Sequence, residues 1–134
     1  MLVACELARI VRRPDPNEGQ YIYLVEKGGA RALPIVIGKP EADEIYRKFM
    51  GKPNPRPFTH DLLREMLSQL GGRIEGVEVV QLKEGTFHAK LVIRCEDRQL
   101  KIDCRPSDGI ALAVAEDAPI SVDEKVFDDA TNGA

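Results

Sequence analysis

Four polar residues stand where a strand pattern passes into a helix pattern, in the stretch IDCRPSDGIALA at residues 102–113. They are Asp103, Arg105, Ser107 and Asp108. A guanidinium can bind phosphate oxygens in a bidentate way, and carboxylates can serve as bases or as ligands of Mg²⁺ or Mn²⁺. The same residues can also stabilise a helix start, with Ser107 as a cap and Asp108 in the first turn. Two interpretations therefore stand: the group pins the junction, or it binds and cleaves a phosphodiester.

A second polar group lies in RPFTHD, residues 56–61, after a proline-rich loop. Arg56 is a phosphate ligand by type, Thr59 is a good N-cap, and His60 can transfer protons near neutral pH. Asp61 again suits a helix N-terminus. The chain has only one other histidine, His88, so we do not expect a zinc site built on histidines.

Hydrophobic periodicity predicts the elements that must position these groups. We expect strands over residues 2–11, 20–26, 31–38, 74–82, 86–95, 98–104 and 119–122, and helices from Pro40 to residue 50, from Thr59 to residue 70 and over 107–117, followed by a last helical piece after Asp123. The mixed order predicts an α+β domain over residues 1–130, with a mixed, mostly antiparallel sheet, about three packed helices and a loose tail at 131–134. Pro34 predicts an edge position for its strand.

The alternation of apolar and polar residues predicts which face of the sheet each side chain takes in the strands 86–95 and 98–104, and how these two strands pair. A two-residue turn at 96–97 would place Lys90 opposite Asp103 and His88 opposite Arg105, forming one polar patch. Two apolar groups are expected to face the core: Leu62, Leu63, Met66, Leu67 and Leu70 on the second helix, and Leu100, Ile102 and Cys104 on the strand 98–104.

Composition narrows the class of protein. The chain has 134 residues, a net charge of −3 and three cysteines without C-x-x-C spacing. We expect free cysteines, no membrane span and, because the start is unlike a signal peptide, a cytoplasmic location. The stretch 47–60 contains four Lys or Arg and no acid, so a polyanion could meet a local basic loop despite the acidic whole.

Four segments, LPIVIGKPEADEIYRKFMG, RPFTHDLL, LKEGTFHAKL and IDCRPSDGIALA, together resemble the bifunctional nuclease family from about Leu33 to Ile120. The resemblance implies a nuclease acting on RNA and single-stranded DNA. Carried over by position, its polar motif residues are Glu41, Arg56, Thr59, His60, Asp61, Asp103, Arg105, Ser107 and Asp108. The chain departs from the family pattern at His88, where Tyr is common, and at Cys104 and Gly109, where Ala is usual.

These observations give a hypothesis with named roles. The catalytic candidates are Asp103, Asp108, His60 and Asp61, the substrate-binding candidates are Arg56, Arg105, Ser107, Thr59, Lys90 and His88, and Asp103 with Asp108 would hold a divalent cation, Mg²⁺ or Mn²⁺. The partner would be RNA or single-stranded DNA, and a homo-oligomer is an expectation. The alternative is a non-enzymatic regulatory or interaction module, in which the same Arg/Asp network forms an interface or a ligand pocket. The acidic composition favours that alternative.

Overall fold

A computed structural model describes residues 1–132 of the chain. Its strands are β1 (Leu2–Val11), β2 (Gln20–Glu26), β3 (Ala32–Ile37), β4 (Gly72–Lys83), β5 (Thr86–Cys95), β6 (Arg98–Cys104) and β7 (Ile120–Asp123). Its helices are α1 (Lys39–Phe49), α2 (Thr59–Gln69), α3 (Pro106–Ala115) and α4 (Glu124–Thr131). Within the described residues, no helix is long and apolar enough to span a bilayer.

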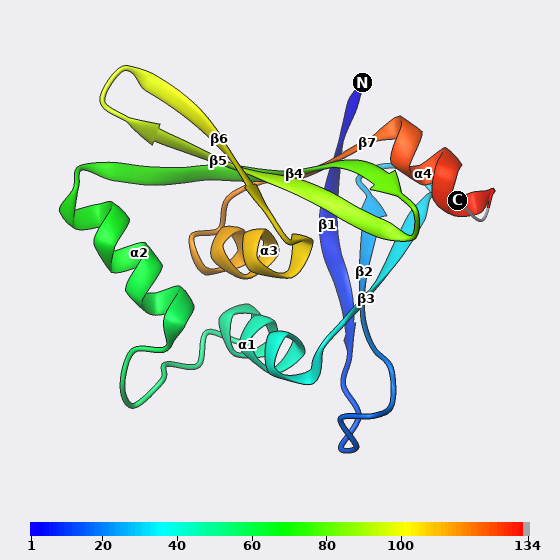
Figure 1. The fold of residues 1–134 in the computed structure, drawn as a ribbon, viewed down its shortest axis with the longest axis horizontal. Coiled ribbons are helices and arrows are strands. Elements are labelled where there is room, and N and C mark those ends of the chain that lie inside the picture. The colour runs from blue at the N-terminus through cyan, green and yellow to red at the C-terminus, as the bar shows by residue number, and fades with distance from the viewer. Residues whose placement is uncertain (133–134) are drawn as a thin grey trace.

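The seven strands form one sheet in the order β3-β2-β1-β7-β4-β5-β6. Only β4 and β7 run parallel; the other neighbours are antiparallel. Figure 1 shows α1, α2 and α3 together on one side of the sheet, whereas α4 packs against β3, β4 and β7. The predicted α+β class with a mixed, mostly antiparallel sheet is confirmed, with four helices rather than about three among the described residues.

The predicted register of the hairpin is confirmed over the residues that pair in β5 and β6. Lys90 lies opposite Asp103 and Leu91 opposite Ile102 in the β5–β6 ladder. The ladder ends at Cys104, so the predicted pairing of His88 with Arg105 was wrong. Pro34 lies on β3, one of the two edge strands, as predicted.

The core lies between the sheet and α3. Ile110, Ala111 and Ala113 of this helix are fully buried because its sequence is apolar on all sides. Gly109 permits a close approach of α3 to β4. A Cβ atom at this position would lie 2.5 Å from Cγ2 of Val77 and 3.0 Å from Sγ of Cys104. Gly109 and Cys104 therefore share a confined space between α3 and the sheet.

Several local expectations were wrong. The N-caps are Phe58 for α2 and Arg105 for α3, and neither Thr59 nor Ser107 caps its helix; Ser107 is instead buried inside α3. Ile102 is exposed, and so are all members of the predicted apolar stripe of α2 except Leu67. Of the predicted loose tail, Thr131 belongs to α4, and residues 133–134 lie outside the described residues.

The substitution Gly109→Ala tests the close approach of α3 to the sheet. Alanine favours a helix by about 1 kcal/mol over glycine, but the added methyl group would collide with the buried Val77. We expect the free energy of unfolding to fall by about 1–3 kcal/mol, measured by urea denaturation. A Gly109→Ala variant as stable as the parent would show that α3 and β4 are not so tightly packed.

Candidate active site

A cavity of about 560 Å³ opens where the N-termini of α2 and α3 meet α1. Its polar lining comes from all three helices: Glu41, Asp43, Glu44 and Arg47 from α1, Thr59 and His60 from α2, and Arg105 and Asp108 at the start of α3. Phe58 adds a half-exposed aromatic ring, with the Arg47 guanidinium 5.0 Å from its centre. The fold thus brings the two polar segments recognised in the sequence to one opening.

Asp108 is the residue that joins these segments. Its carboxylate accepts hydrogen bonds from Nε and Nη2 of Arg105, at 2.8 and 3.0 Å, and lies 2.9 Å from Nε2 of His60. Burial raises the pKa of Asp108, but the hydrogen bonds from Arg105 and His60 outweigh it, and the pKa falls below its ordinary value of 3.8. An ionised carboxylate only accepts, so Nε2 of His60 carries the hydrogen in this contact.

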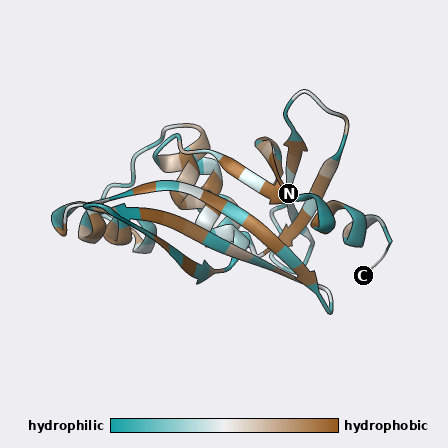
Figure 2. Cartoon of the chain, turned by 90° about the horizontal axis from the view of Figure 1, so that it is seen from above, coloured by the Kyte–Doolittle hydropathy of each residue, from teal (hydrophilic) through white to brown (hydrophobic). Residues whose placement is uncertain are grey.

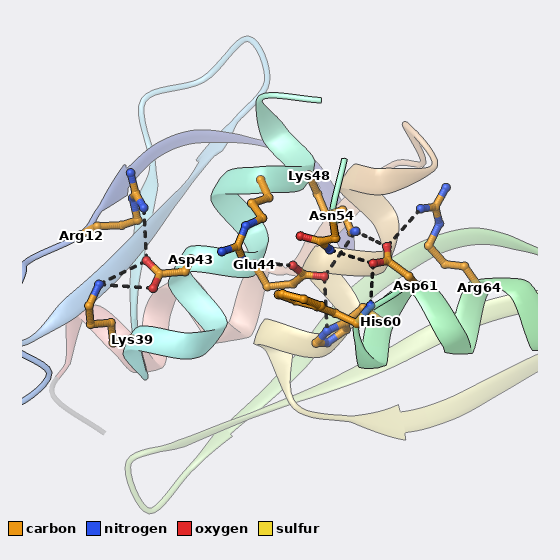
Figure 3. Close-up of polar contacts among 11 residues, drawn as sticks. Arg12, Lys39, Asp43, Glu44, Lys48, Asn54, His60, Asp61 and Arg64 are labelled. Atoms are coloured by element: carbon orange, nitrogen blue, oxygen red, sulfur yellow. Dashed lines mark hydrogen bonds and ion pairs between the residues drawn. The ribbon is translucent and has the colours of Figure 1, made fainter. Parts of the chain in front are cut away.

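The other ring nitrogen of His60 faces a carboxylate that the sequence did not single out. Nδ1 lies 4.0 Å from Oε2 of Glu44, whose side chain is only 6% exposed. Neither carboxylate oxygen of Glu44 has a hydrogen-bond partner, although Nζ of Lys48 lies 3.3 Å away. Figure 3 shows Glu44 pointing toward His60. The spacing of Glu44 and Lys48, four residues apart on one helix, was the available signal.

Asp61 has a structural place beside this cavity. Its carboxylate is paired with Nζ of Lys48 and accepts hydrogen bonds from Nδ2 of Asn54 at 2.7 Å and from the backbone N–H of Phe58 at 2.9 Å (Figure 3). Burial by itself raises the pKa of Asp61, but these donors hold it well below its ordinary value. A carboxylate that accepts this many hydrogen bonds is a weak base. Asp61 instead fastens the start of α2 to α1.

Arg105 is the most accessible cation of the group, with its side chain 63% exposed. Two of its nitrogens are held by Asp108, while Nη1 lies 4.0 Å from a carboxylate oxygen of Glu41. The hydrogen bonds to Asp108 also raise the pKa of Arg105 above its ordinary value. The guanidinium is therefore always charged and held at the cavity by Asp108.

Other predicted site residues lie outside this cavity. Asp103 is 73% exposed and has Nζ of Lys90 3.8 Å away, and His88 is on β5. Arg56 is exposed and makes no ion pair or side-chain hydrogen bond with residues 1–132. Ser107 lines a neighbouring cavity of about 310 Å³ that also contacts Arg105. In residues 1–132, no three His, Cys, Asp or Glu side chains are grouped so as to hold a metal ion.

The ion pair of Asp61 should make the stability of the fold sensitive to acid. Because the folded-state pKa lies below the ordinary 3.8, the unfolded chain binds this proton more readily. The contribution is complete above 3.8 and is lost as the pH falls through the folded-state pKa. We expect Asp61→Asn to lower the free energy of unfolding by about 1–3 kcal/mol at neutral pH, with the difference shrinking in acid. Urea denaturation over a pH series measures it, and a difference independent of pH would contradict the assignment.

Comparison with known protein sequences places this chain in a family. The sequence model of the bifunctional nuclease domain matches residues 22–133. An uncharacterized protein of Mycobacterium tuberculosis is 41% identical over 117 residues, which cover 87% of this chain and 70% of that protein. Bifunctional nuclease 1 of Oryza sativa subsp. indica and a bifunctional nuclease of Oryza minuta are each 24% identical over 122 residues, covering 88% of this chain but 37% of theirs. The family implies a nuclease-like function. With most of its length matched and the motif residues of two helix starts meeting at one cavity, the chain belongs to the bifunctional nuclease domain family.

Proposed function

We propose that this chain hydrolyses phosphodiester bonds of RNA and single-stranded DNA at the cavity between α1, α2 and α3. The observation that carries the proposal is the bridging of Arg105 and His60 by one carboxylate, Asp108, at the mouth of an open cavity. It joins a fixed positive charge to an imidazole, the side chain that most often transfers protons in enzymes. The names of the rice relatives support nuclease chemistry, although the match spans little more than a third of their length.

Arg105 would bind the scissile phosphate. The exposed guanidinium offers donors to phosphate oxygens, and Asp108 holds it in place before substrate arrives, so little reorganisation is needed. Arg47 brings a second positive charge to the same cavity. These cations would stabilise the negative charge that develops on the phosphorus centre during attack.

His60 would act as the general base. Asp108 fixes the imidazole with its hydrogen on Nε2, which leaves Nδ1 to take a proton from an attacking water. The water oxygen would form a bond to phosphorus as the bond from phosphorus to the leaving sugar oxygen breaks, and the imidazolium would return the proton to that oxygen. Nδ1 faces the buried carboxylate of Glu44, which stabilises the imidazolium formed in this step. Asp61 and Lys48 would hold His60 in position, because they fasten the first turn of α2.

A divalent cation is a further element of the proposal. Glu41, Asp43, Glu44 and Asp108 are the carboxylates that line the cavity with Arg105, whereas Asp103 lies outside it. Magnesium commonly binds through one or two carboxylates together with substrate phosphate oxygens. Mg²⁺ or Mn²⁺ would therefore be held by carboxylates of the cavity in company with the nucleic acid, rather than by Asp108 together with Asp103.

One observation favours the alternative, a non-enzymatic regulatory or interaction module. Asp108 serves as a hydrogen-bond partner of both Arg105 and His60 within the chain, as expected of a network that only stabilises the junction of α2 and α3. Arg105→Ala separates the two functions. Loss of cleavage with unchanged folding and assembly supports the nuclease, whereas loss of assembly without any activity to lose supports the module.

Substitutions of the bridged residues test the proposed chemistry directly. We expect His60→Asn and Asp108→Asn each to lower the rate of cleavage by about 100-fold or more, because the general base is lost or misoriented. Asp103→Asn is the matched control, since this exposed carboxylate lies outside the cavity; at a concentration where its assembly equals that of the parent, it should leave the rate nearly unchanged. The assay uses single-stranded RNA and DNA with and without EDTA, and EDTA shows whether a cation is required.

Two outcomes would contradict the proposal. Activity that survives in both the His60→Asn and the Asp108→Asn proteins would place the chemistry elsewhere or point to a contaminant. Activity lost in Asp103→Asn but kept in Asp108→Asn would move the site to the other face of the β5–β6 hairpin. Circular dichroism of each variant separates loss of activity from loss of fold.

A further inference from the structure

Helix α2 is attached to the molecule by its polar side. His60 contacts Asp108, Asp61 contacts Lys48, and Nε of Arg64 donates to Glu116 at 2.8 Å. None of the residues of α2 is buried. A free-standing helix of this length is marginal in water, so a helix held mainly by such contacts would gain stability from another partner.

The apolar stripe of α2 faces away from these contacts. Leu62, Leu63, Met66 and Leu70 recur at helical spacing on one side, and 45–79% of each is exposed. Figure 2 shows this hydrophobic banding on the helix at the end of the molecule. Only Leu67, the stripe member turned toward the body, packs near Gly72 and Cys95. An exposed stripe of this kind marks an interaction surface.

The neighbouring sheet edge is also uncovered. Strand β6 is the last strand of the sheet, and Ile102 on it is 46% exposed. Ile102 lies two residues before Cys104 on the strand, so both side chains project to the same face of the sheet. The sulfur of Cys104 lies under α3, and Ile102 therefore projects to the side that carries the helices. The opposite edge, β3, contains Pro34, a residue that discourages pairing, but β6 has neither proline nor bulge.

We propose that α2 and β6 form the contact surface between two copies of this chain. Two β6 strands would pair antiparallel about a two-fold axis at Ile102. In this register each Lys101 lies opposite Asp103 of the second copy, so the pairing is complementary in charge and occurs twice. A register centred one residue earlier would place lysine opposite lysine, which disfavours it.

The same axis explains the stripe on α2. A two-fold axis perpendicular to the sheet keeps the helices of both copies on one side of the extended sheet, where Figure 1 places α2 beneath the end that carries the β5–β6 turn. The two stripes and the two Ile102 side chains would then share one apolar layer. Because α2 carries His60, assembly would also fix one wall of the cavity. The dimer itself does not depend on the proposed nuclease activity.

The first experiment measures the oligomeric state of the full chain. Sedimentation velocity and light scattering over a range of micromolar concentrations should give a dimer for the parent. The double variant Leu63→Glu/Met66→Glu should be monomeric, with dimerisation weakened on the order of 100-fold or more. Both positions are exposed, so the fold should persist in circular dichroism. Val36→Glu, the same kind of change at the exposed face of the β3 edge, is the matched control and should remain dimeric.

The second experiment tests the register. Residues directly opposite in an antiparallel pair are close enough for a disulfide, so Ile102→Cys should give a reducible dimer under mild oxidation. The cross-link should be absent in the parent and in Val36→Cys, and should disappear when Leu63→Glu/Met66→Glu is added. A monomeric parent at every concentration, a dimer that survives the double substitution, or a dimer without the Ile102→Cys cross-link would each overturn the proposal.

Discussion

The packing of α3 against β4 is the constraint on which the rest of the structure depends. Gly109 lets the helix lie so close to Val77 that a single methyl group would have no room. Because the β5–β6 hairpin delivers the chain to this helix at Cys104, the register of that hairpin fixes where α3 begins. The buried run from Ile110 onward then leaves only the first turn of the helix free to face the cavity. Arg105 is exposed there and Asp108 is half-buried, whereas residues 109–113 that follow are packed in the core.

Charge compensation holds the remaining wall of the cavity. Lys48 is largely buried and lies between the carboxylates of Glu44 and Asp61, which is the condition under which a buried ammonium is tolerated. Asp61 in turn accepts from the N-terminus of α2 and so places His60 within hydrogen-bond distance of Asp108. Helix α2 is thus located by electrostatics rather than by apolar burial.

The two proposals meet in α2 but stand on separate observations. The nuclease proposal depends on the cavity and on the family to which the chain belongs. The dimer proposal depends on an uncovered stripe and an unpaired strand edge. If both hold, the apolar side of α2 stabilises the assembly while its first turn supplies the general base. The surface that joins the two copies would then also determine how firmly the active site is held.

The sequence alone determined the elements, the α+β class, the hairpin register and the edge position of Pro34. These depend on neighbouring residues, on periodicity and on turn chemistry, all of which are local. It also identified Arg105, His60 and Asp108, since their residue types and the family resemblance mark them wherever they lie. Only the tertiary structure decided that Asp108 joins the other two, that Glu44 faces His60, and that Asp103 stands apart. It also showed that the stripe of α2 faces outward, which the sequence could not decide. A hydrophobic pattern shows which side of a helix must be covered, but not which part of a folded chain or of its neighbour will cover it.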